Sequence, residues 1–182
     1  EFRRVLFRSG AGDIRHMKYW KNKPKFYSLA DISKDMMKFA EQRLQNKNIP
    51  FDSILLNRDE KLPLNDNSID IIISFYSLEH LFPLSNYLKE MKRVLKKGGT
   101  LIGAIPSEGG VAWGLGRMIT SRRWFKKNTS IDPDKIICWE HPNFADDIIS
   151  SLDNEFCKKK LKWYPLRFPS VDMNLIIQFN YT

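Results

Sequence analysis

The sequence predicts a doubly wound α/β fold with a sheet of about seven strands, mostly parallel and with one antiparallel strand near the C-terminus. Apolar, strand-like runs alternate with amphipathic helical runs from residue 5 to Pro106. A Gly-Ala-Gly turn at residues 10–12 follows the first apolar run, and Lys-Lys-Gly-Gly at residues 96–99 precedes a later one. Strand, turn, helix and strand in this order are typical of parallel sheets covered by helices.

The elements of this first part follow from local patterns. Short apolar runs predict buried strands at 5–7, 25–30, 53–56, 69–74 and 100–105. Helical spacing predicts helices at 13–20, 34–46 and 83–96, the last ended by Gly98-Gly99. Ser33 is suited to cap the second helix and Pro83 to open the third. The apolar face of the second helix is expected to contain Met36, Met37, Ala40 and Leu44.

The pattern changes after Pro106. Residues 107–143 are rich in Gly, Trp, Arg and Lys and have weak helical periodicity, which predicts an inserted segment with one short helix at 111–120. Asn143 is expected to cap another helix that continues to Leu152. Two strand-like runs, 156–164 and 173–181, then predict a closing hairpin.

Composition narrows the class of protein. A chain of 182 residues with 42% hydrophobic residues suits one globular domain. The formal net charge is +9, but the basic residues are scattered, so nucleic acid is not the favoured partner. No apolar run reaches the roughly 18 residues of a transmembrane helix. Cys138 and Cys157 lack metal-binding or redox spacing and predict buried, unpaired thiols in a cytoplasmic protein.

The first nine residues, EFRRVLFRS, match the translation of a common short-read sequencing adapter at every position. We interpret residues 1–9 as an adapter-derived artefact joined to a truncated gene, so that residues 10–182 form the single authentic domain. The alternative is an ordinary basic N-terminus. Arg3, Arg4 and Arg8 minus Glu1 contribute +2 of the net charge of +9. Residues 5–7 can still serve as a surrogate first strand.

The Gly-Ala-Gly turn and an acidic residue predict a nucleotide-type ligand. Gly10, Ala11 and Gly12 allow close approach of the backbone to a ligand. Asp31, followed by Ile32, stands at the predicted end of the next strand, 19 residues after Gly12. A carboxylate there can accept both hydroxyl protons of a ribose, and capping of the next helix is its alternative role.

Together with LPLNDNSIDIIISFYSLEHLFPLSNYLKEMKRVLKKGG at residues 62–99, these motifs resemble the class I S-adenosylmethionine (SAM)-dependent methyltransferases, and within them the type 11-like enzymes. The resemblance covers Gly10 to about Pro106 and, more loosely, the final hairpin. It implies a Rossmann-like sheet, SAM as cofactor and methyl transfer as the reaction. A nicotinamide dehydrogenase is disfavoured because the usual third glycine or alanine is missing.

Two positions depart from the family pattern. The acidic residue that holds the SAM amino group falls on Arg8, and the acidic residue near the adenine falls on Arg58, followed by Asp59. Asp59 either reaches the adenine from a shifted register or is a solvated loop charge. Because Arg8 and Arg58 replace these acidic residues, a further alternative is a non-catalytic relative that no longer binds SAM.

Polar residues after the later strands are the candidates for the reaction. Ser74 and Tyr76 are expected to line the place where the methyl donor meets its acceptor, because ligands bind beyond the carboxyl ends of such strands. His80, Glu140 and His141 are the candidate general bases. Support of the fold is the favoured role of the Glu79-His80 pair and an equal alternative for Glu140 and His141. Some relatives bind a metal through a Glu at the position of Tyr76, so no metal is expected here.

The acceptor is expected to be a small molecule or a glycan or lipid precursor, selected by the substrate-side segment 107–143. An RNA or protein methyltransferase is the alternative. Trp113, Arg117, Arg122, Arg123, Trp124, Lys126 and Lys127 form a basic, aromatic stretch in this segment. Its candidate roles are binding of an anionic substrate, a nucleic acid or a lipid headgroup, or a solvated lid. The oligomeric state is not indicated.

Overall fold

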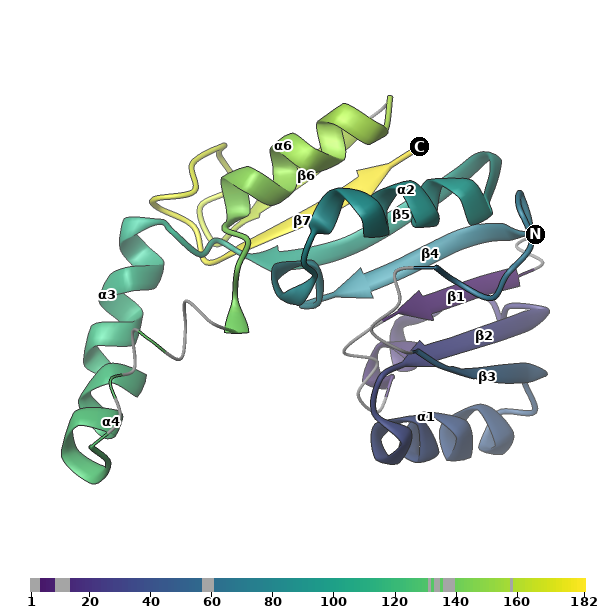
Figure 1. Cartoon of the computed structure of the whole chain (residues 1–182), viewed down its shortest axis with the longest axis horizontal. Helices are drawn as coiled ribbons and strands as arrows, with labels where there is room; N and C mark the ends of the chain where they lie inside the picture. Colours follow the sequence, from purple (N-terminus) through teal and green to yellow (C-terminus); the bar gives the residue numbers. More distant parts are fainter. Residues whose placement is uncertain are drawn as a thin grey trace.

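The structure is a computed structural model of the chain. It describes the main chain of residues 4–8 and residues 14–56, 61–130, 132, 135, 140–157 and 159–182. A central twisted sheet carries α2 (Leu84–Val94) and α6 (Ala145–Glu155) on one face and α1 (Lys34–Asn46) on the other (Figure 1). This arrangement confirms the doubly wound α/β fold class.

The sheet is mostly parallel. Its strand order is β3-β2-β1-β4-β5-β7-β6, and all pairs from β3 to β5 are parallel. Among the strands of the described residues, only β7 runs against its neighbours β5 and β6, so the antiparallel strand lies near the C-terminus as predicted. The strands are β1 (Arg4–Arg8), β2 (Phe26–Asp31), β3 (Phe51–Leu55), β4 (Ile69–Phe75), β5 (Leu95–Pro106), β6 (Lys159–Tyr164) and β7 (Ile176–Tyr181).

The remaining helical elements are short. Those that lie wholly within the described residues are η1 (Arg15–Tyr19), η2 (Leu78–His80), α3 (Val111–Ile119) and α4 (Ser121–Asn128). The segment predicted as a short helix after the glycine turn is the 3₁₀ helix η1, and the sequence prediction missed α4. Among the residues that the structure describes, no helix has the length and apolar character needed to span a membrane.

Helix α1 has the predicted bounds and the predicted cap. Ser33 Oγ accepts a hydrogen bond of 3.4 Å from the amide of Met36. Met37, Ala40 and Leu44 are buried against the sheet. The placement of Met36 on the apolar face was wrong, because its side chain is 44% exposed. Met37, the next residue, is buried in the same turn, and Met36 lies about 100° around the helix from it, at the edge of the apolar face.

Helix α2 ends earlier than predicted. It stops at Val94, and Leu95 already pairs with Ile69 at the start of β5. Gly98-Gly99 therefore does not end the helix but lies in an irregular part of β5, with Gly98 at φ +78°. Hydrogen bonding to β4 determines this boundary, and local sequence preference does not.

Strands β4 and β5 approach closely at Gly103, which pairs with Ser74. A Cβ atom at residue 103 would lie 1.8 Å from the carbonyl oxygen of Ser74 and 2.6 Å from the ring of Phe179. Only glycine fits between these atoms, and the carboxyl ends of the two strands are thereby held side by side.

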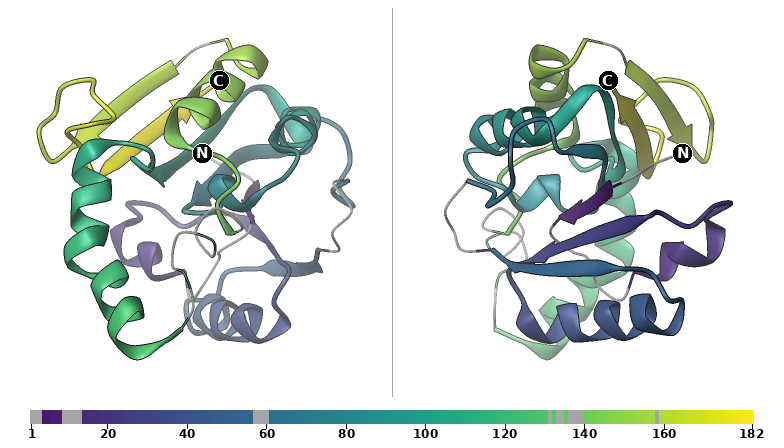
Figure 2. Two further views of the ribbon diagram at one scale, coloured as in Figure 1. Left: turned by 60° about the vertical axis from the view of Figure 1, so that its left-hand side comes forward. Right: turned by 90° about the vertical axis from the view of Figure 1, so that its right-hand side faces the viewer.

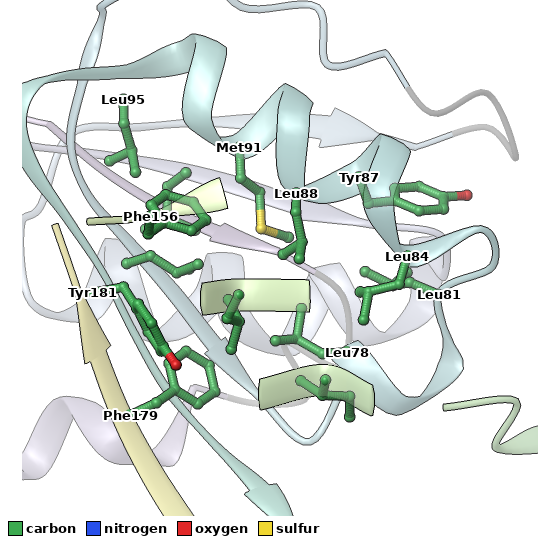
Figure 3. Packing of buried hydrophobic residues seen from close by; sticks show 14 of the residues in the cluster. Leu78, Leu81, Leu84, Tyr87, Leu88, Met91, Leu95, Phe156, Phe179 and Tyr181 are labelled. Atoms are coloured by element: carbon green, nitrogen blue, oxygen red, sulfur yellow. The ribbon is translucent and has the colours of Figure 1, made fainter. Parts of the chain in front are cut away.

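Two hydrophobic cores cover the two faces. On one face, α2 and α6 pack on β4, β5 and β7, where Leu88, Met91, Phe156 and Tyr181 meet (Figure 3). On the other face, the smaller core contains Tyr27, Leu29, Met37, Ala40 and Leu44. The predicted apolar side of α2 is confirmed, since Leu84, Leu88, Met91, Val94 and Leu95 are all buried.

The C-terminal part differs from prediction in three details. Asn143 does not cap α6; the main-chain amide of Phe144 instead donates to Asp147 Oδ2 at 3.3 Å. Strands β6 and β7 begin three residues later than predicted, at Lys159 and Ile176. Cys157 is exposed rather than buried, and Cys138 lies outside the described residues.

Candidate functional site

The carboxyl ends of the parallel strands meet at one edge of the sheet. Asp31 ends β2, Phe75 ends β4 and Pro106 ends β5. In Figure 1 these ends point toward the side from which α3 and α4 project. Ligands of open parallel sheets bind beyond this edge, so it is the candidate site.

Asp31 is almost fully buried at this edge, with 3% exposure. Its Oδ1 accepts a hydrogen bond of 2.8 Å from the amide of Ser33, and its carbonyl accepts one of 2.8 Å from the amide of Leu56. The carboxylate therefore orders the turn before α1, the alternative role considered for it. Ile32, directly after it, is 66% exposed and stands open to a ligand.

Several predicted cofactor residues cannot be placed. Gly10, Ala11, Gly12, Arg58 and Asp59 lie outside the described residues. Arg8 is described by its main chain, which ends β1 in register with Ala30. Ile14, the first residue after the glycine turn that is described, is buried and has a φ of +45°, a conformation that a β-branched residue rarely adopts.

The turn after β4 presents Tyr76 at the edge. Tyr76 has a φ of +51°, and its amide donates to the carbonyl of Ala104 at 2.9 Å. Below it, the hydroxyls of Ser74 and Ser77 are 2.6 Å apart and buried. The phenol ring is 46% exposed. Partial burial, and then the nearby carboxyl of Glu79, raise the pKa of Tyr76, so it stays a neutral hydrogen-bonding group.

A buried carboxylate after β5 interacts with two other side chains. Glu108 is 3% exposed; its Oε2 pairs with Nδ1 of His141 and its Oε1 with the guanidinium of Arg117. The sequence analysis named His141 but not Glu108 as a site residue. The signal was present, because Ser107-Glu108 follows the apolar strand β5 directly at its carboxyl end.

The structure brings the three predicted catalytic residues together. The rings of His80 and His141 meet edge to face, with centroids 4.5 Å apart. Nδ1 of His80 is 2.7 Å from the carbonyl oxygen of Glu140. Glu140 thus joins the cluster through its main chain, while its side chain is exposed. This weakens the case for the Glu140 carboxylate as a base.

Asn143 connects this cluster to the end of β4. Its buried side-chain amide donates to the carbonyls of Leu78 at 3.0 Å and Leu81 at 2.7 Å. These bonds explain why Asn143 is not a helix cap: its amide holds η2 against residues 140–143. The contact of His80 Nδ1 with the Glu140 carbonyl adds to this connection, in line with the fold-supporting role considered for the Glu79-His80 pair.

Glu79 is a second buried carboxyl in the cluster, with 2% exposure. Within the described part of the chain, its Oε2 has no hydrogen-bond partner. Burial raises the pKa of Glu79, and nearby Glu108 raises it further, against the opposing effect of His80 and His141. Among the described residues, no three His, Cys, Asp or Glu side chains are grouped to hold a metal ion.

The residues at this edge are chemically suited to SAM. A carboxylate at the end of β2 can accept ribose hydroxyls, and Asp31 is already oriented by the amide of Ser33. Tyr76 offers a partly exposed ring and hydroxyl beside β4. A nucleoside and an amino acid portion therefore both find fitting groups among the described residues.

Comparison with known proteins gives a family. Residues 7–103 match the family described as "Methyltransferase domain". A ubiquinone/menaquinone biosynthesis C-methyltransferase of Ectopseudomonas mendocina is 36% identical over 75 residues, which is 41% of this chain and 29% of that protein. An uncharacterized protein of Escherichia coli K12 is 38% identical over 76 residues, or 42% of this chain and 35% of that protein. The matches thus span about a third of these relatives.

Solved structures share the fold over nearly the whole chain. A SAM-dependent methyltransferase from Archaeoglobus fulgidus is similar with a TM-score of 0.66 and 16% identity, covering 99% of this chain and 86% of that one. One from Aquifex aeolicus gives a TM-score of 0.61 at 14% identity, covering 100% and 84%. At these identities the likeness concerns the fold alone.

Proposed function

This chain belongs to the methyltransferase domain family, and from that premise we propose that it is a SAM-dependent methyltransferase acting on a small molecule or a glycan or lipid precursor. One observation carries the proposal: Asp31 ends β2, Tyr76 follows β4 and Glu108 follows β5 with His141 bonded to it, and these strands end at the same edge of the sheet. Groups suited to the cofactor and a group suited to proton removal therefore share one site.

The cofactor supplies an electrophilic methyl group on a sulfonium sulfur. Asp31 would hold the ribose hydroxyls, with Ile32 beside it, and Ser74 and Tyr76 would contact the methionine portion. Gly10, Ala11 and Gly12 would approach it through their backbone, and Arg58 or Asp59 would lie near the adenine. No metal is needed for this transfer, because the protein has only to orient the acceptor and take its proton.

His141 is the base in this proposal. A carboxylate only accepts hydrogen bonds, so Nδ1 of His141 carries the proton that it shares with Glu108. Its other nitrogen, Nε2, is then deprotonated and can take a proton from an acceptor hydroxyl or amine. Glu108 acts as a positioning residue, and Arg117 pairs with its other carboxylate oxygen. His80 and Glu140 support the imidazole rather than react.

The segment 107–143 would serve as the substrate-side insertion in this proposal. It contributes Glu108, Arg117 and His141, and α3 and α4 project from it beyond the carboxyl edge (Figure 1). Because related proteins are named for ubiquinone/menaquinone biosynthesis, a quinone precursor is the first lipid-precursor acceptor to assay. We place the protein in the cytoplasm, where an exposed free thiol such as Cys157 stays reduced.

Calorimetric titration with SAM tests the cofactor assignment. Asp31→Asn keeps an acceptor for the Ser33 amide but removes the charge, and we expect SAM to bind at least about tenfold more weakly. Asp35→Asn, on the exposed first turn of α1, is the matched control and should bind as the unsubstituted chain does. Equal affinity of the Asp31→Asn variant would refute the ribose role, and absence of SAM binding by both the unsubstituted chain and the Arg8→Asp variant would refute the proposed cofactor.

A further inference from the structure

Helix α3 is amphipathic with its apolar side turned outward. Val111, Leu115, Met118 and Ile119 recur at helical spacing on one stripe, and their side chains are 54–72% exposed. The opposite side carries Arg117, which stacks on Trp113 at 5.6 Å and pairs with buried Glu108. A surface helix normally buries its aliphatic stripe. Here the cation faces the protein and the aliphatic stripe faces outward.

Helix α4 continues this arm and adds charge. Thr120 ends α3 and begins α4, and neither helix has a buried residue. Figures 1 and 2 show the two helices as one arm that projects from the sheet. Arg123, Lys126 and Lys127 are exposed, and Trp124 is 57% exposed among them. The sequence contains no Asp or Glu from Gly109 to Ile131.

A loop fastened to the first turn of α3 also carries exposed apolar side chains. The amide of Ala112 donates to the carbonyl of Asp172 at 2.7 Å, which fastens the first turn of α3 to the loop between β6 and β7. Leu166, Phe168 and Met173 of this loop are 41–53% exposed. Arg167 is exposed beside them. The loop therefore adds exposed apolar side chains and one cation at this end of the molecule.

We propose that α3 and α4, residues 111–128, form an interfacial arm that binds the surface of an anionic lipid bilayer. The aliphatic stripe of α3 would enter the acyl boundary, Trp124 would lie at the headgroup level, and the cations of α4 would contact anionic headgroups. This inference goes beyond the proposed enzyme activity and does not depend on it.

Charge and shape favour a bilayer over other occupants. A nucleic acid would use the cations but leave Leu115, Met118 and Ile119 exposed to water. A second copy docking through the same arm would bring Arg123, Lys126 and Lys127 of both copies together without acidic partners on the arm. A negatively charged bilayer suits both the aliphatic stripe of α3 and the cations of α4, since it has an apolar interior and an anionic surface.

Vesicle co-sedimentation of the complete chain tests the proposal. We expect binding to phosphatidylcholine vesicles that contain about 30% phosphatidylglycerol, little binding to pure phosphatidylcholine, and weakening in high salt. The triple variant Arg123→Gln/Lys126→Gln/Lys127→Gln should bind anionic vesicles at least about tenfold more weakly. Leu115→Gln/Met118→Gln/Ile119→Gln should lose at least as much, because the apolar stripe supplies the insertion.

Matched control variants test whether binding depends on the arm itself or only on the number of exposed cations and apolar side chains. Lys21→Gln/Lys89→Gln/Lys97→Gln removes three exposed cations elsewhere, and Met36→Gln/Phe39→Gln removes two exposed apolar groups of α1. Both controls should bind nearly as the unsubstituted chain does, and circular dichroism should show all variants folded. The quenching of tryptophan fluorescence by brominated lipid should fall in Trp124→Phe.

Several results would overturn the inference. Equal binding to neutral and anionic vesicles, or none to either, would remove the electrostatic part. Full binding by the Leu115→Gln/Met118→Gln/Ile119→Gln variant would remove insertion, and retained binding of a single-stranded RNA by that variant would point to nucleic acid instead. A dimer in light scattering that this variant dissociates, without vesicle binding by the unsubstituted chain, would assign the stripe to a second copy.

Discussion

Nδ1 of His141 and Oε2 of Glu108 form a hydrogen-bonded pair although the two residues are 33 positions apart in the sequence. The other carboxylate oxygen of Glu108 pairs with Arg117 of α3. The amide of Ala145 adds a hydrogen bond of 3.1 Å to the carbonyl of Glu108. Glu108, buried after β5, therefore holds both the arm formed by α3 and α4 and the segment that leads into α6.

Replacing Glu108 by Gln is expected to lower the free energy of unfolding by about 1–3 kcal/mol. The amide leaves Arg117 without its anionic partner at a site where the carboxylate is 3% exposed. Urea denaturation measures the loss, and trypsin should cleave within residues 117–127 more rapidly. Asp35→Asn breaks only an exposed ion pair with Lys38 and should leave both readouts almost unchanged. Identical stability and cleavage of the two variants would contradict a stabilising role for the Glu108 contacts.

Glu79 should make stability depend on pH in an unusual direction. Burial raises its pKa in the folded protein, so the folded state binds the proton more tightly than the unfolded state does. Its contribution is fully present below the unfolded pKa and is lost as pH rises through the raised, folded pKa. The Glu79→Gln variant cannot ionise, and its stability relative to the unsubstituted chain should increase from about pH 4 to about pH 7. Urea midpoints at both pH values measure this, and a decrease would contradict it.

Gly103 should tolerate no side chain. Gly103→Ala would place Cβ 1.8 Å from the carbonyl oxygen of Ser74, and backbone displacement should cost at least about 2 kcal/mol. Gly116→Ala is the matched control, since a Cβ at residue 116 meets no atom within 4 Å. In helix α3 that control should gain about 0.5–1 kcal/mol. Thermal unfolding of both variants separates the two effects, and a harmless Gly103→Ala would disprove the close approach.

Arg8→Asp should strengthen SAM binding about tenfold. Family resemblance implies an acidic residue at this position that holds the SAM amino group, and a cation there repels it. Arg4→Asp, at the opposite end of β1, is the charge-matched control and should change affinity little. Calorimetric titration compares the two variants. Equal SAM affinity of the Arg8→Asp variant and the unsubstituted chain would contradict the prediction.

Elements with a strong local pattern were predictable. The bounds of α1 and the cap at Ser33 followed from residues adjacent in the chain, and the buried side of α2 followed from helical spacing. The predictions were wrong where a contact with a residue far away in the chain determines the end of a helix or the role of a side chain. The end of α2 depends on pairing of Leu95 with Ile69, and Asn143 bonds to Leu78 and Leu81 instead of capping its own helix.

The candidate site divides in the same way. Asp31, Tyr76, His80 and His141 were predictable as residues that follow strands or stand in polar motifs. The contacts of Glu108 with His141 and Arg117 could not be predicted, because these side chains come from three separate segments. The outward stripe of α3 was also hidden, since helical periodicity states which residues share a face but not which way that face points.

By itself, the sequence determined the alternation of strands and helices, the doubly wound fold class and the family resemblance, because these depend on hydrophobic periodicity and on motifs within short windows. The tertiary structure alone decided where β5 begins, which histidine is paired with a buried carboxylate, and that the apolar side of α3 faces away from the protein. Each of these depends on contacts between residues far apart in the chain, which no local pattern encodes.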